Sequence, residues 1–428
     1  MKWATRNWEE PLRKAKPFRI SKRVVVEAYK RIKANKGAAG VDDESIAGFE
    51  KDLKNNLYKI WNRMSSGSYF PPPVREVGID KKDGGQRKLG VPTVSDRIAQ
   101  MVVKMYFEPA VEPCFHADSY GYRPGKSAIE AVGVARKRCW CSDWVLDLDI
   151  KGFFDNLDHE LMMRAVRKHT DCTWVVLYIE RWLKAPVQRE DGALIGRDKG
   201  TPQGSVISPL LANLFLHYAF DEWMRRNYPY MLFERYADDI IVHCKSERQG
   251  KWIKEVIEKR LSECKLELNP NKTKIVYCKD DKRKGNYANE KFDFLGYTFR
   301  PRIVKARSAN RFFVGFNPAV SEEAAKSVRD TIRGWRIHRM SDKSIDDISR
   351  IINPVVRGWL NYYGSYFRSA LYPILNQLNN ALRKWAMRKY KRLRGRRRKT
   401  TRWLRPMARR DPGLFAHWQF SKRSAAGR

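Results

Sequence analysis

The order of hydrophobic and polar positions predicts a chain that starts with helices, continues with strands mixed with helices, and ends with helices. Residues 1–60 have mostly helical spacing, with a break at the sequence NKGAAG in residues 35–40. The segment WVLDLDI, at residues 144–150, alternates apolar and acidic positions, which is the periodicity of a strand. Residues 321–390 have helical spacing again. This order predicts an α+β core followed by an all-helical module.

Two segments within this pattern predict tight hairpins. The strand-like VREVGI is followed by the turn sequence Asp83-Gly84-Gly85, so we expect the chain to pair back through residues 87–89. FERYADDIIVHC, at residues 233–244, predicts two short strands around the turn Ala237-Asp238-Asp239.

The remaining core segments have simpler patterns. Ser208-Pro209 predicts the start of an apolar helix, with the serine as N-cap and the proline in the first helical position. Residues 248–264 have helical spacing, and FDFLGYTF at residues 292–299 predicts one strand.

The composition excludes global disorder and favours a polyanionic partner. The 428 residues are 43% hydrophobic and include 86 Lys and Arg against 48 Asp and Glu, a formal net charge of +38. Such a field favours nucleic acid first and an anionic membrane second. No run of about 18 apolar residues is present, so we expect no membrane span. The N-terminus lacks the apolar segment of a secretory signal, and the cysteines lack paired metal-binding spacings. We therefore expect a cytoplasmic protein with free thiols and no zinc module.

Basic residues are concentrated near the C-terminal end. Residues 386–428 contain 16 Lys and Arg and one acid, Asp411. The run RLRGRRRK, at residues 392–399, is typical of a basic arm that orders on a phosphate backbone, and a solvated tail is the alternative. A purely solvated tail has little use for large aromatic side chains, so those present favour contact with nucleic acid. They are Trp403, Phe415, Trp418 and Phe420.

Acidic residues at two predicted strand ends are the candidates for chemistry. Asp149 follows an apolar strand, and Asp238 and Asp239 are adjacent in an apolar hairpin. Burying such charges costs several kcal/mol each unless they are paired or bound to a cation. Carboxylate oxygens select Mg²⁺, and carboxylates on neighbouring strands could hold two ions about 3.5–4 Å apart for in-line displacement at phosphorus. The alternative, a solvated turn, is disfavoured by the flanking Tyr236 and the apolar residues 240–242.

Several motifs occur in order along nearly the whole chain. YADD (236–239) and the Asp149 strand with the following KGFFDNLDH resemble the catalytic centre of reverse transcriptases. The other motifs are NKGAAGVD (35–42), DGGQRKLGVPTVSDR (83–97), SYGYRPGKSA (119–128), GTPQGSVISPLLAN (200–213), LNPNKTK (268–274), FDFLGYTF (292–299) and INPVVRGWLNYYG (352–364). Together they resemble the reverse transcriptase/maturase proteins encoded by bacterial group II introns.

This resemblance implies a right-hand polymerase, with fingers and palm built on an antiparallel sheet, followed by a helical thumb. The implied regions are an N-terminal extension and fingers at residues 1–143, a palm at residues 144–315 with a fingers-contributed segment around residues 160–200, a helical thumb or maturase domain at residues 316–390, and a basic DNA- or RNA-binding tail at residues 391–428.

The resemblance also implies the catalytic centre. Asp149 and Asp238 would be shared ligands of two Mg²⁺ ions, Asp239 would complete the site, and the Ile150 carbonyl would contact the nucleotide-side ion. The substrates would be dNTPs and an RNA template with a DNA primer.

Further residues are implied at the nucleotide. Lys81 and Arg87 would clamp the triphosphate, and Phe154 would clash with a ribose 2′-hydroxyl, although a core phenylalanine is its simpler interpretation. The other expected nucleotide-binding residues are Gln203, Gly204 and Lys272; for Lys272, a surface lysine is an equal alternative.

Binding of the parent intron RNA and the target DNA is implied for the helical and basic regions. The candidate contacts are Arg357, Lys389, Lys391, Arg392, Arg394, Arg396, Arg397 and Arg398. Many relatives carry a zinc-supported DNA endonuclease with paired cysteines, and no cysteine lies beyond Cys278, so we expect the endonuclease-lacking (group IIC-like) lineage. The expected function is RNA-dependent DNA synthesis with assistance to intron splicing and mobility, in a bacterial nucleoid-associated ribonucleoprotein. The alternatives are a free-standing reverse transcriptase of a defence or repair system, and a non-enzymatic RNA chaperone.

Overall fold

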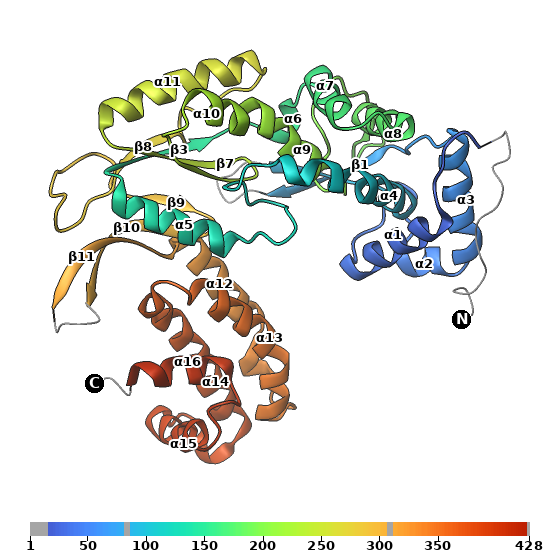
Figure 1. Cartoon of the computed structure of the whole chain (residues 1–428). Coiled ribbons are helices and arrows are strands. Elements are labelled where there is room, and N and C mark those ends of the chain that lie inside the picture. Colours follow the sequence, from blue (N-terminus) through green and yellow to red (C-terminus); the bar gives the residue numbers. More distant parts are fainter. Residues whose placement is uncertain (1–15, 81–85, 306–310, 426–428) are drawn as a thin grey trace. The chain divides into compact units, whose positions relative to one another are not determined.

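The computed structural model describes residues 16–80, 86–305 and 311–425 (Figure 1). The chain divides into two compact units. Unit 1 consists of Met1–Ser127, Leu148–Val242 and Lys251–Thr273, and unit 2 of Ala128–Asp147, His243–Gly250 and Lys274–Arg428.

Unit 1 starts with a group of packed helices, as the helical spacing predicts. They are α1 (Lys22–Asn35), α2 (Ile46–Glu50), α3 (Leu53–Ser66) and α4 (Val94–Val111). The predicted break after α1 packs against the first turn of α4: Arg97 donates to the Ala38 carbonyl at 2.7 Å. Gly40 lies so close to α4 that a Cβ atom there would be 2.6 Å from the Thr93 backbone, so only glycine fits without displacement.

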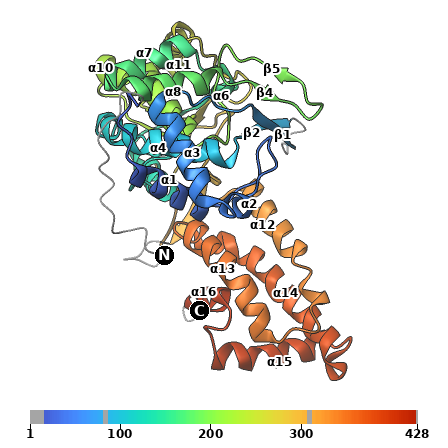
Figure 2. The same cartoon turned by 90° about the vertical axis from the view of Figure 1, so that its right-hand side faces the viewer.

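The predicted hairpin before α4 is present. β1 (Val74–Asp80) pairs antiparallel with β2 (Gln86–Val91), from Arg75↔Val91 to Asp80↔Gln86. Two short strands, β4 (Val187–Gln188) and β5 (Leu194–Ile195), extend this sheet in the order β2-β1-β4-β5 (Figure 2). Lys81 lies outside the described residues.

The middle of unit 1 is mostly helical. Its helices are α6 (Phe153–Asn156), α7 (His159–His169), α8 (Thr173–Lys184), α9 (Ser208–Leu216), the π-helical turn η2 (His217–Asp221), α10 (Glu222–Asn227) and most of α11 (Glu247–Glu263).

The start of α9 differs from the prediction. The N-cap position is Ile207, and Ser208 is already helical, so the predicted serine N-cap is wrong, whereas Pro209 does lie in the first turn. The Ser208 hydroxyl is hydrogen-bonded to the Thr201 hydroxyl at 2.7 Å. The free backbone N–H groups before the helix are bound by Gln100, whose Oε1 accepts from Val206 N at 2.8 Å and also from Ile207 N. A distant side chain therefore caps this helix.

Gln100 is itself held by a buried carboxyl group. Asp96 is 1% exposed, and it accepts hydrogen bonds from Gln100 Nε2 at 2.9 Å, Tyr69 Oη at 2.8 Å and Trp182 Nε1 at 2.7 Å. Burial raises the pKa of Asp96 to about 6, although the three donors act in the opposite direction.

The central sheet has the order β6-β7-β3-β8. Its strands are β3 (Trp144–Asp149), β6 (Phe233–Tyr236), β7 (Asp239–Cys244) and β8 (Lys274–Tyr277). β6 and β7 form the antiparallel hairpin predicted around Ala237-Asp238-Asp239, with Tyr236 opposite Asp239. The strand predicted at residues 144–150 is also confirmed.

A second sheet, within unit 2, has the order β11-β10-β9. The prediction of one strand at residues 292–299 is wrong, because β9 (Phe292–Phe294) and β10 (Tyr297–Lys305) are antiparallel. The intervening Leu295 and Gly296 have φ values of 50° and 76°, and two such residues reverse a chain as in a primed hairpin turn. β11 (Phe312–Val320) completes the sheet, and α5 (Ala128–Cys141) packs on β11.

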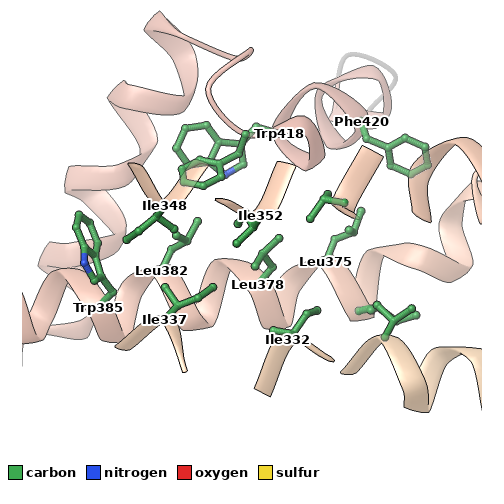
Figure 3. Packing of buried hydrophobic residues seen from close by; sticks show 14 of the residues in the cluster. Ile332, Ile337, Ile348, Ile352, Leu375, Leu378, Leu382, Trp385, Trp418 and Phe420 are labelled. Atoms are coloured by element: carbon green, nitrogen blue, oxygen red, sulfur yellow. The ribbon is translucent and has the colours of Figure 1, made fainter. Parts of the chain in front are cut away.

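The rest of unit 2 is the predicted helical module. Its helices are α12 (Glu322–Gly334), α13 (Ile345–Tyr363), α14 (Tyr372–Lys389), α15 (Arg397–Arg410) and α16 (Ala416–Ala425). α13 begins at a capping box in which Ser344 and Asp347 bind each other's backbone N–H groups. One hydrophobic cluster joins these helices, with Trp385 and Leu382 fully buried in it (Figure 3).

The C-terminal aromatic residues belong to this same cluster. Phe415 is fully buried, and Trp418 and Phe420 are 6% and 7% exposed. Asn353 of α13 donates to the Leu414 carbonyl at 2.8 Å and accepts from Ala416 N at 3.0 Å, which fixes the start of α16. Packing into the protein core therefore accounts for these rings, so they give no support to nucleic-acid contact by the basic segment, which stays a prediction.

The four predicted regional boundaries stay predictions.

Among the residues that the structure describes, no helix is both long and apolar enough to cross a membrane.

We predict that Phe415→Ala destabilises unit 2 by about 3–5 kcal/mol, because it opens a cavity in the core shared with α13 and α14. Urea denaturation followed by tryptophan fluorescence would measure the loss. Arg405→Ala, at an exposed position of α15, is the control and should change stability by less than about 0.5 kcal/mol. Equal stabilities of the two variants would show that residues 411–420 do not support the module.

Candidate active site

Asp149 is fixed at the last position of β3 by the LNPNKTK motif. The Asp149 carbonyl accepts from Asn269 N at 2.8 Å, and Asp149 N is 3.4 Å from the Thr273 hydroxyl. The next residue, Ile150, forms a β-bridge with Leu268. The motif therefore holds the backbone on both sides of Asp149, and it leaves the carboxylate half-buried at the strand end.

Asp238 and Asp239 lie on the tight turn of the β6–β7 hairpin, and β7 is the neighbour of β3 in the sheet (Figure 1). Ala237 has a φ of 55°, a left-handed conformation that is uncommon for a residue with a Cβ atom. Such a conformation persists where the surroundings hold it. The turn therefore needs support from the protein beneath it.

A buried ion pair supplies part of this support. Arg235 is fully buried, and its guanidinium binds both carboxylate oxygens of Asp221 at 2.7 and 2.5 Å. The same guanidinium donates to the Ala237 carbonyl and to Asn213 Oδ1, each at 3.0 Å. Asp221 lies in the π-helical turn that follows α9, a helix variant often found at functional sites. Through Asn213, Arg235 thus links the aspartate turn to the apolar helix α9.

A second contact supports the turn from the SYGYRPGKSA motif. Tyr120 N donates to the Arg235 carbonyl at 2.8 Å, and Asn213 Nδ2 donates to the Gly121 carbonyl at 2.6 Å. A Cβ atom on Gly121 would lie 2.4 Å from Ala237 N, which is closer than any side chain allows. Glycine at residue 121 is therefore a condition for the observed position of the turn.

The three aspartates affect one another electrostatically. Burial, the Asp238 charge and the Asp149 charge raise the pKa of Asp239 to about 6. Although Asp239 keeps contact with solvent, protein atoms on its other sides disfavour the charged form. Burial and Asp149 likewise raise the pKa of Asp238, whereas Arg87 and Arg235 lower it. Negative charge is thus concentrated here and is only partly compensated.

This donor set fits Mg²⁺ in charge and in chemistry. Carboxylate oxygens are hard ligands, and a divalent cation would offset the burial and the neighbouring negative charge that raise the pKa values of Asp238 and Asp239. Among the residues that the structure describes, no three His, Cys, Asp or Glu side chains are gathered closely enough to form a complete metal site.

Arg87 and the GTPQG segment lie together beside these aspartates. Arg87 Nε donates to Gln203 Oε1 at 2.5 Å, and Gly90 N donates to the Gln203 carbonyl at 2.7 Å. Gly204 has a φ of 115°, and a Cβ atom there would be 2.7 Å from the Gly90 carbonyl oxygen. The structure thus joins the fingers-like hairpin to the predicted nucleotide pocket through Gln203-Gly204.

Phe154 and Lys272 also lie in unit 1. Phe154 is 6% exposed in the short helix after Asp149, and its carbonyl accepts from Thr201 N at 2.8 Å. The Lys272 charge lowers the pKa of Asp239, so this ammonium lies within electrostatic reach of the aspartates. The structure therefore gathers the described nucleotide-site candidates around one place.

A family model for reverse transcriptases (RNA-dependent DNA polymerases) matches residues 79–299, about half of the chain. The chain belongs to the reverse transcriptase family. A second model, for the maturase-specific domain of group II introns, matches residues 325–403 of this reverse transcriptase. The matches confirm the predicted family, the reverse transcriptase activity and the role in assisting intron splicing.

Curated relatives give the same result. Protein YkfC of Escherichia coli K12 is 31% identical over an alignment of 327 residues, which covers 66% of this chain and 81% of that protein. The group II intron-encoded protein LtrA of Lactococcus lactis subsp. cremoris is 27% identical over 439 residues, covering 82% of this chain and 69% of LtrA. A 91 kDa protein in the cob intron of Schizosaccharomyces pombe is 26% identical over 427 residues, covering 81% of this chain and 50% of that protein.

The candidate RNA-binding residues of the reverse transcriptase lie in unit 2. Arg357 is exposed on α13, and Lys389 at the end of α14 donates to the backbone carbonyls of Ser341 and Lys343 at 3.1 and 2.7 Å. The others are exposed at the start of the predicted tail: Lys391, Arg392, Arg394, Arg396, Arg397 and Arg398. Burial and, to a smaller extent, the nearby charge of Arg397 lower the pKa of Arg383, so like charges are close to one another there.

The sequence did not reveal the residues beneath the turn. Arg235, Asp221 and Asn213 are far apart in sequence, and each alone is an ordinary polar residue in an apolar segment. An arginine in a segment predicted to be a core strand is a usable signal, because such a charge must find a buried partner. The partner itself could not be chosen from the sequence.

We predict that Gly121→Ala lowers the rate of primer extension by about 10²-fold, because displacement of a reacting group by about 1 Å has such effects. Steady-state primer extension on an RNA template would measure it, with thermal unfolding to show that the variant folds. Gly196→Ala is the control, since a Cβ atom at this exposed glycine meets nothing within 4 Å. Full activity of Gly121→Ala would mean that the turn tolerates displacement.

Proposed function

We propose that the Asp149, Asp238 and Asp239 cluster is the centre at which an RNA-templated DNA primer is extended with dNTPs. The observation that carries this proposal is that three aspartates lie together on adjacent strands: Asp149 at the end of β3, and Asp238 and Asp239 where β6 turns into β7. Burial and the Asp149 charge raise the pKa values of both Asp238 and Asp239. Uncompensated carboxylates at one place, within a reverse transcriptase domain, suit a site that binds cations and polyphosphate.

Asp149 and Asp238 would hold two Mg²⁺ ions, with Asp239 and the Ile150 carbonyl as further ligands. Bound Mg²⁺ supplies a lowered pKa for the primer 3′-hydroxyl and neutralises charge that develops on the pyrophosphate. Arg235 keeps the aspartate turn in position from below through the Ala237 carbonyl. Arg87 orients toward the triphosphate from the fingers-like hairpin, with Gln203 as its hydrogen-bond partner. Lys81 of the same hairpin is proposed as a second clamp, and Lys272 as a cation near the triphosphate.

Phe154 is proposed to select deoxynucleotides. Its ring is nearly fully buried and packs edge-to-face on Phe153 at 5.4 Å between centroids, so it has little freedom to move away from a ribose 2′-hydroxyl. A rigid ring at this place could serve both as core and as a steric filter.

The right-hand arrangement of fingers, palm and helical thumb is part of the proposal, and so is binding of the parent intron RNA by the exposed bases of unit 2. The maturase-specific match covers most of α12, all of α13 and α14, and the first half of α15, a stretch that includes Arg357 and the basic cluster at residues 391–398. LtrA, a group II intron-encoded protein, is similar along most of this chain, which favours an intron role over a free-standing defence or repair enzyme. Mobility would follow by target-primed reverse transcription at a DNA site.

The function is tested by replacing Asp238 and Asp239 together with asparagine. We expect DNA synthesis on an RNA template to fall at least about a thousandfold, because the loss of two metal ligands removes several kcal/mol of stabilisation. The affinity for template–primer should change little. Glu255→Gln, at an exposed acid on α11, is the control. Equal loss of synthesis and of nucleic-acid affinity would assign a structural role to the pair, and synthesis that persists in a chelator would contradict the metal site.

We predict that Phe154→Val raises the rate of ribonucleotide relative to deoxynucleotide incorporation by about tenfold or more, within the range that one pocket contact discriminates. Single-nucleotide incorporation with matched rNTP and dNTP would measure the ratio. Phe107→Val is the control, because it creates a similar cavity at a buried ring of α4. An unchanged ratio in Phe154→Val, or an equal change in the control, would leave Phe154 as a core residue only.

A further inference from the structure

The β10–β11 hairpin of unit 2 is longer than its core requires. The two strands pair over nine residues each, from Tyr297↔Val320 to Lys305↔Phe312 (Figure 1). Phe299 and Phe316 in the inner half are fully buried. The outer half extends beyond this core and exposes large apolar side chains: Ile303 is 68%, Phe312 64% and Phe313 38% exposed. Such exposure on a folded hairpin calls for a partner.

The charge of the hairpin identifies the kind of partner. Residues 297–320 contain five Lys and Arg and no Asp or Glu. Within the described part of the chain, no carboxylate pairs with Arg300, which is exposed. An exclusively cationic surface on a chain of net charge +38 repels a second copy and other basic proteins, and it attracts a polyanion. Nucleic acid therefore fits this surface better than another copy of the chain.

Two cations and one aromatic ring, those of Arg300, Arg302 and Phe313, share one face. The register places Arg300 opposite Asn317, Arg302 opposite Gly315, and Val304 opposite Phe313. Directly opposed residues of an antiparallel pair project to the same face, and so do alternate residues of a strand. A Cβ atom on Gly315 would be 3.4 Å from the Phe313 ring, so this ring lies over the glycine, on the side of Arg302.

The protein holds Arg302 in place on this face. Its guanidinium donates to the Asn317 and Thr298 carbonyls at 3.1 and 3.2 Å, and it lies 5.2 Å from the centre of the Phe367 ring. Burial and the neighbouring Arg300 lower the pKa of Arg302 to about 10. The two cations thus repel each other, and a bound phosphate would relieve this repulsion.

Exposed aromatic rings beside cations are typical of surfaces that bind single-stranded nucleic acid. Bases stack on the rings irrespective of sequence, whereas the cations contact the phosphates. Paired bases within a duplex are already stacked, so unpaired nucleotides fit such rings better.

We propose that the outer half of the β10–β11 hairpin binds single-stranded RNA, with phosphates at Arg300 and Arg302 and a base stacked on Phe313, which lies on the same face. The choice of RNA over DNA rests on the proposed intron-binding function, whereas the choice of a single strand rests on the exposed rings.

The test measures binding of a short 5-iodouridine-labelled oligouridine to the full chain, followed by photo-crosslinking and peptide mapping. We expect crosslinks in the peptide that begins at Phe312. Phe313→Ala should weaken binding about tenfold, as the loss of one stacked base does. Arg300→Ala should reduce the log–log salt slope by about 0.7, the value for one phosphate of a single strand. Because these side chains are exposed, both variants should keep the unfolding temperature of the parent.

Two variants in unit 1 are the matched controls: Tyr230→Ala removes a ring that is 65% exposed, and Lys259→Ala removes an exposed cation of α11. Unchanged affinity and salt slope in the hairpin variants, crosslinks confined to other peptides, or equal losses in the controls would overturn the proposal. Equal affinity for an oligodeoxyuridine would overturn the choice of RNA. Primer extension by the parent protein is measured separately, so failure of polymerase activity would be distinguishable from failure of the hairpin site.

Discussion

The structure of the candidate active site depends on holding three carboxylates together although they carry like charge. Asp149, Asp238 and Asp239 lie on adjacent strands, and burial together with the Asp149 charge makes ionisation of Asp238 and Asp239 less favourable. A flexible loop would separate them. The fold prevents this with a two-residue turn in an uncommon conformation at Ala237, a strand end held by the 268–273 segment, and a buried guanidinium beneath the turn.

The need to hold this turn in place explains the buried pair of Arg235 and Asp221. A buried ion pair is weak evidence for stability, because well-packed apolar residues would serve a core at least as well. Here the guanidinium also binds the Ala237 carbonyl and lowers the pKa of Asp238. Arg235 thus has two further roles. It positions the turn, and its charge favours the ionised form of Asp238, where cations and polyphosphate would meet. An apolar replacement could fill the space but could do neither.

Glycines allow backbone segments to approach closely at the predicted nucleotide pocket and beneath the aspartate turn. Gly90 and Gly204 allow the fingers-like hairpin and the GTPQG segment to touch, and Gly121 allows a similar close approach beneath the aspartate turn.

In unit 2, the basic C-terminal segment has a buried side and an exposed side. Its aromatic rings pack into the helical core, and its arginines remain outside, so one amphipathic segment both closes the module and keeps its positive charge exposed.

The sequence alone determined the family, the order of the main elements and both main hairpins, and it supplied the three aspartates proposed as the site, because each depends on local periodicity or on motifs a few residues long. It failed where a residue's environment comes from elsewhere in the chain. Ser208 lost its capping role to Gln100, a residue more than one hundred positions away, and one apparent strand at residues 292–299 became two at Leu295-Gly296. From the sequence, Phe415 and Trp418 could have bound RNA or packed into a core, because the same aromatic side chains occur in both environments; the structure buries them. Only the tertiary structure decided these points and the pairing of Arg235 with Asp221, because a contact partner is a property of the folded chain and leaves no periodic trace in the sequence.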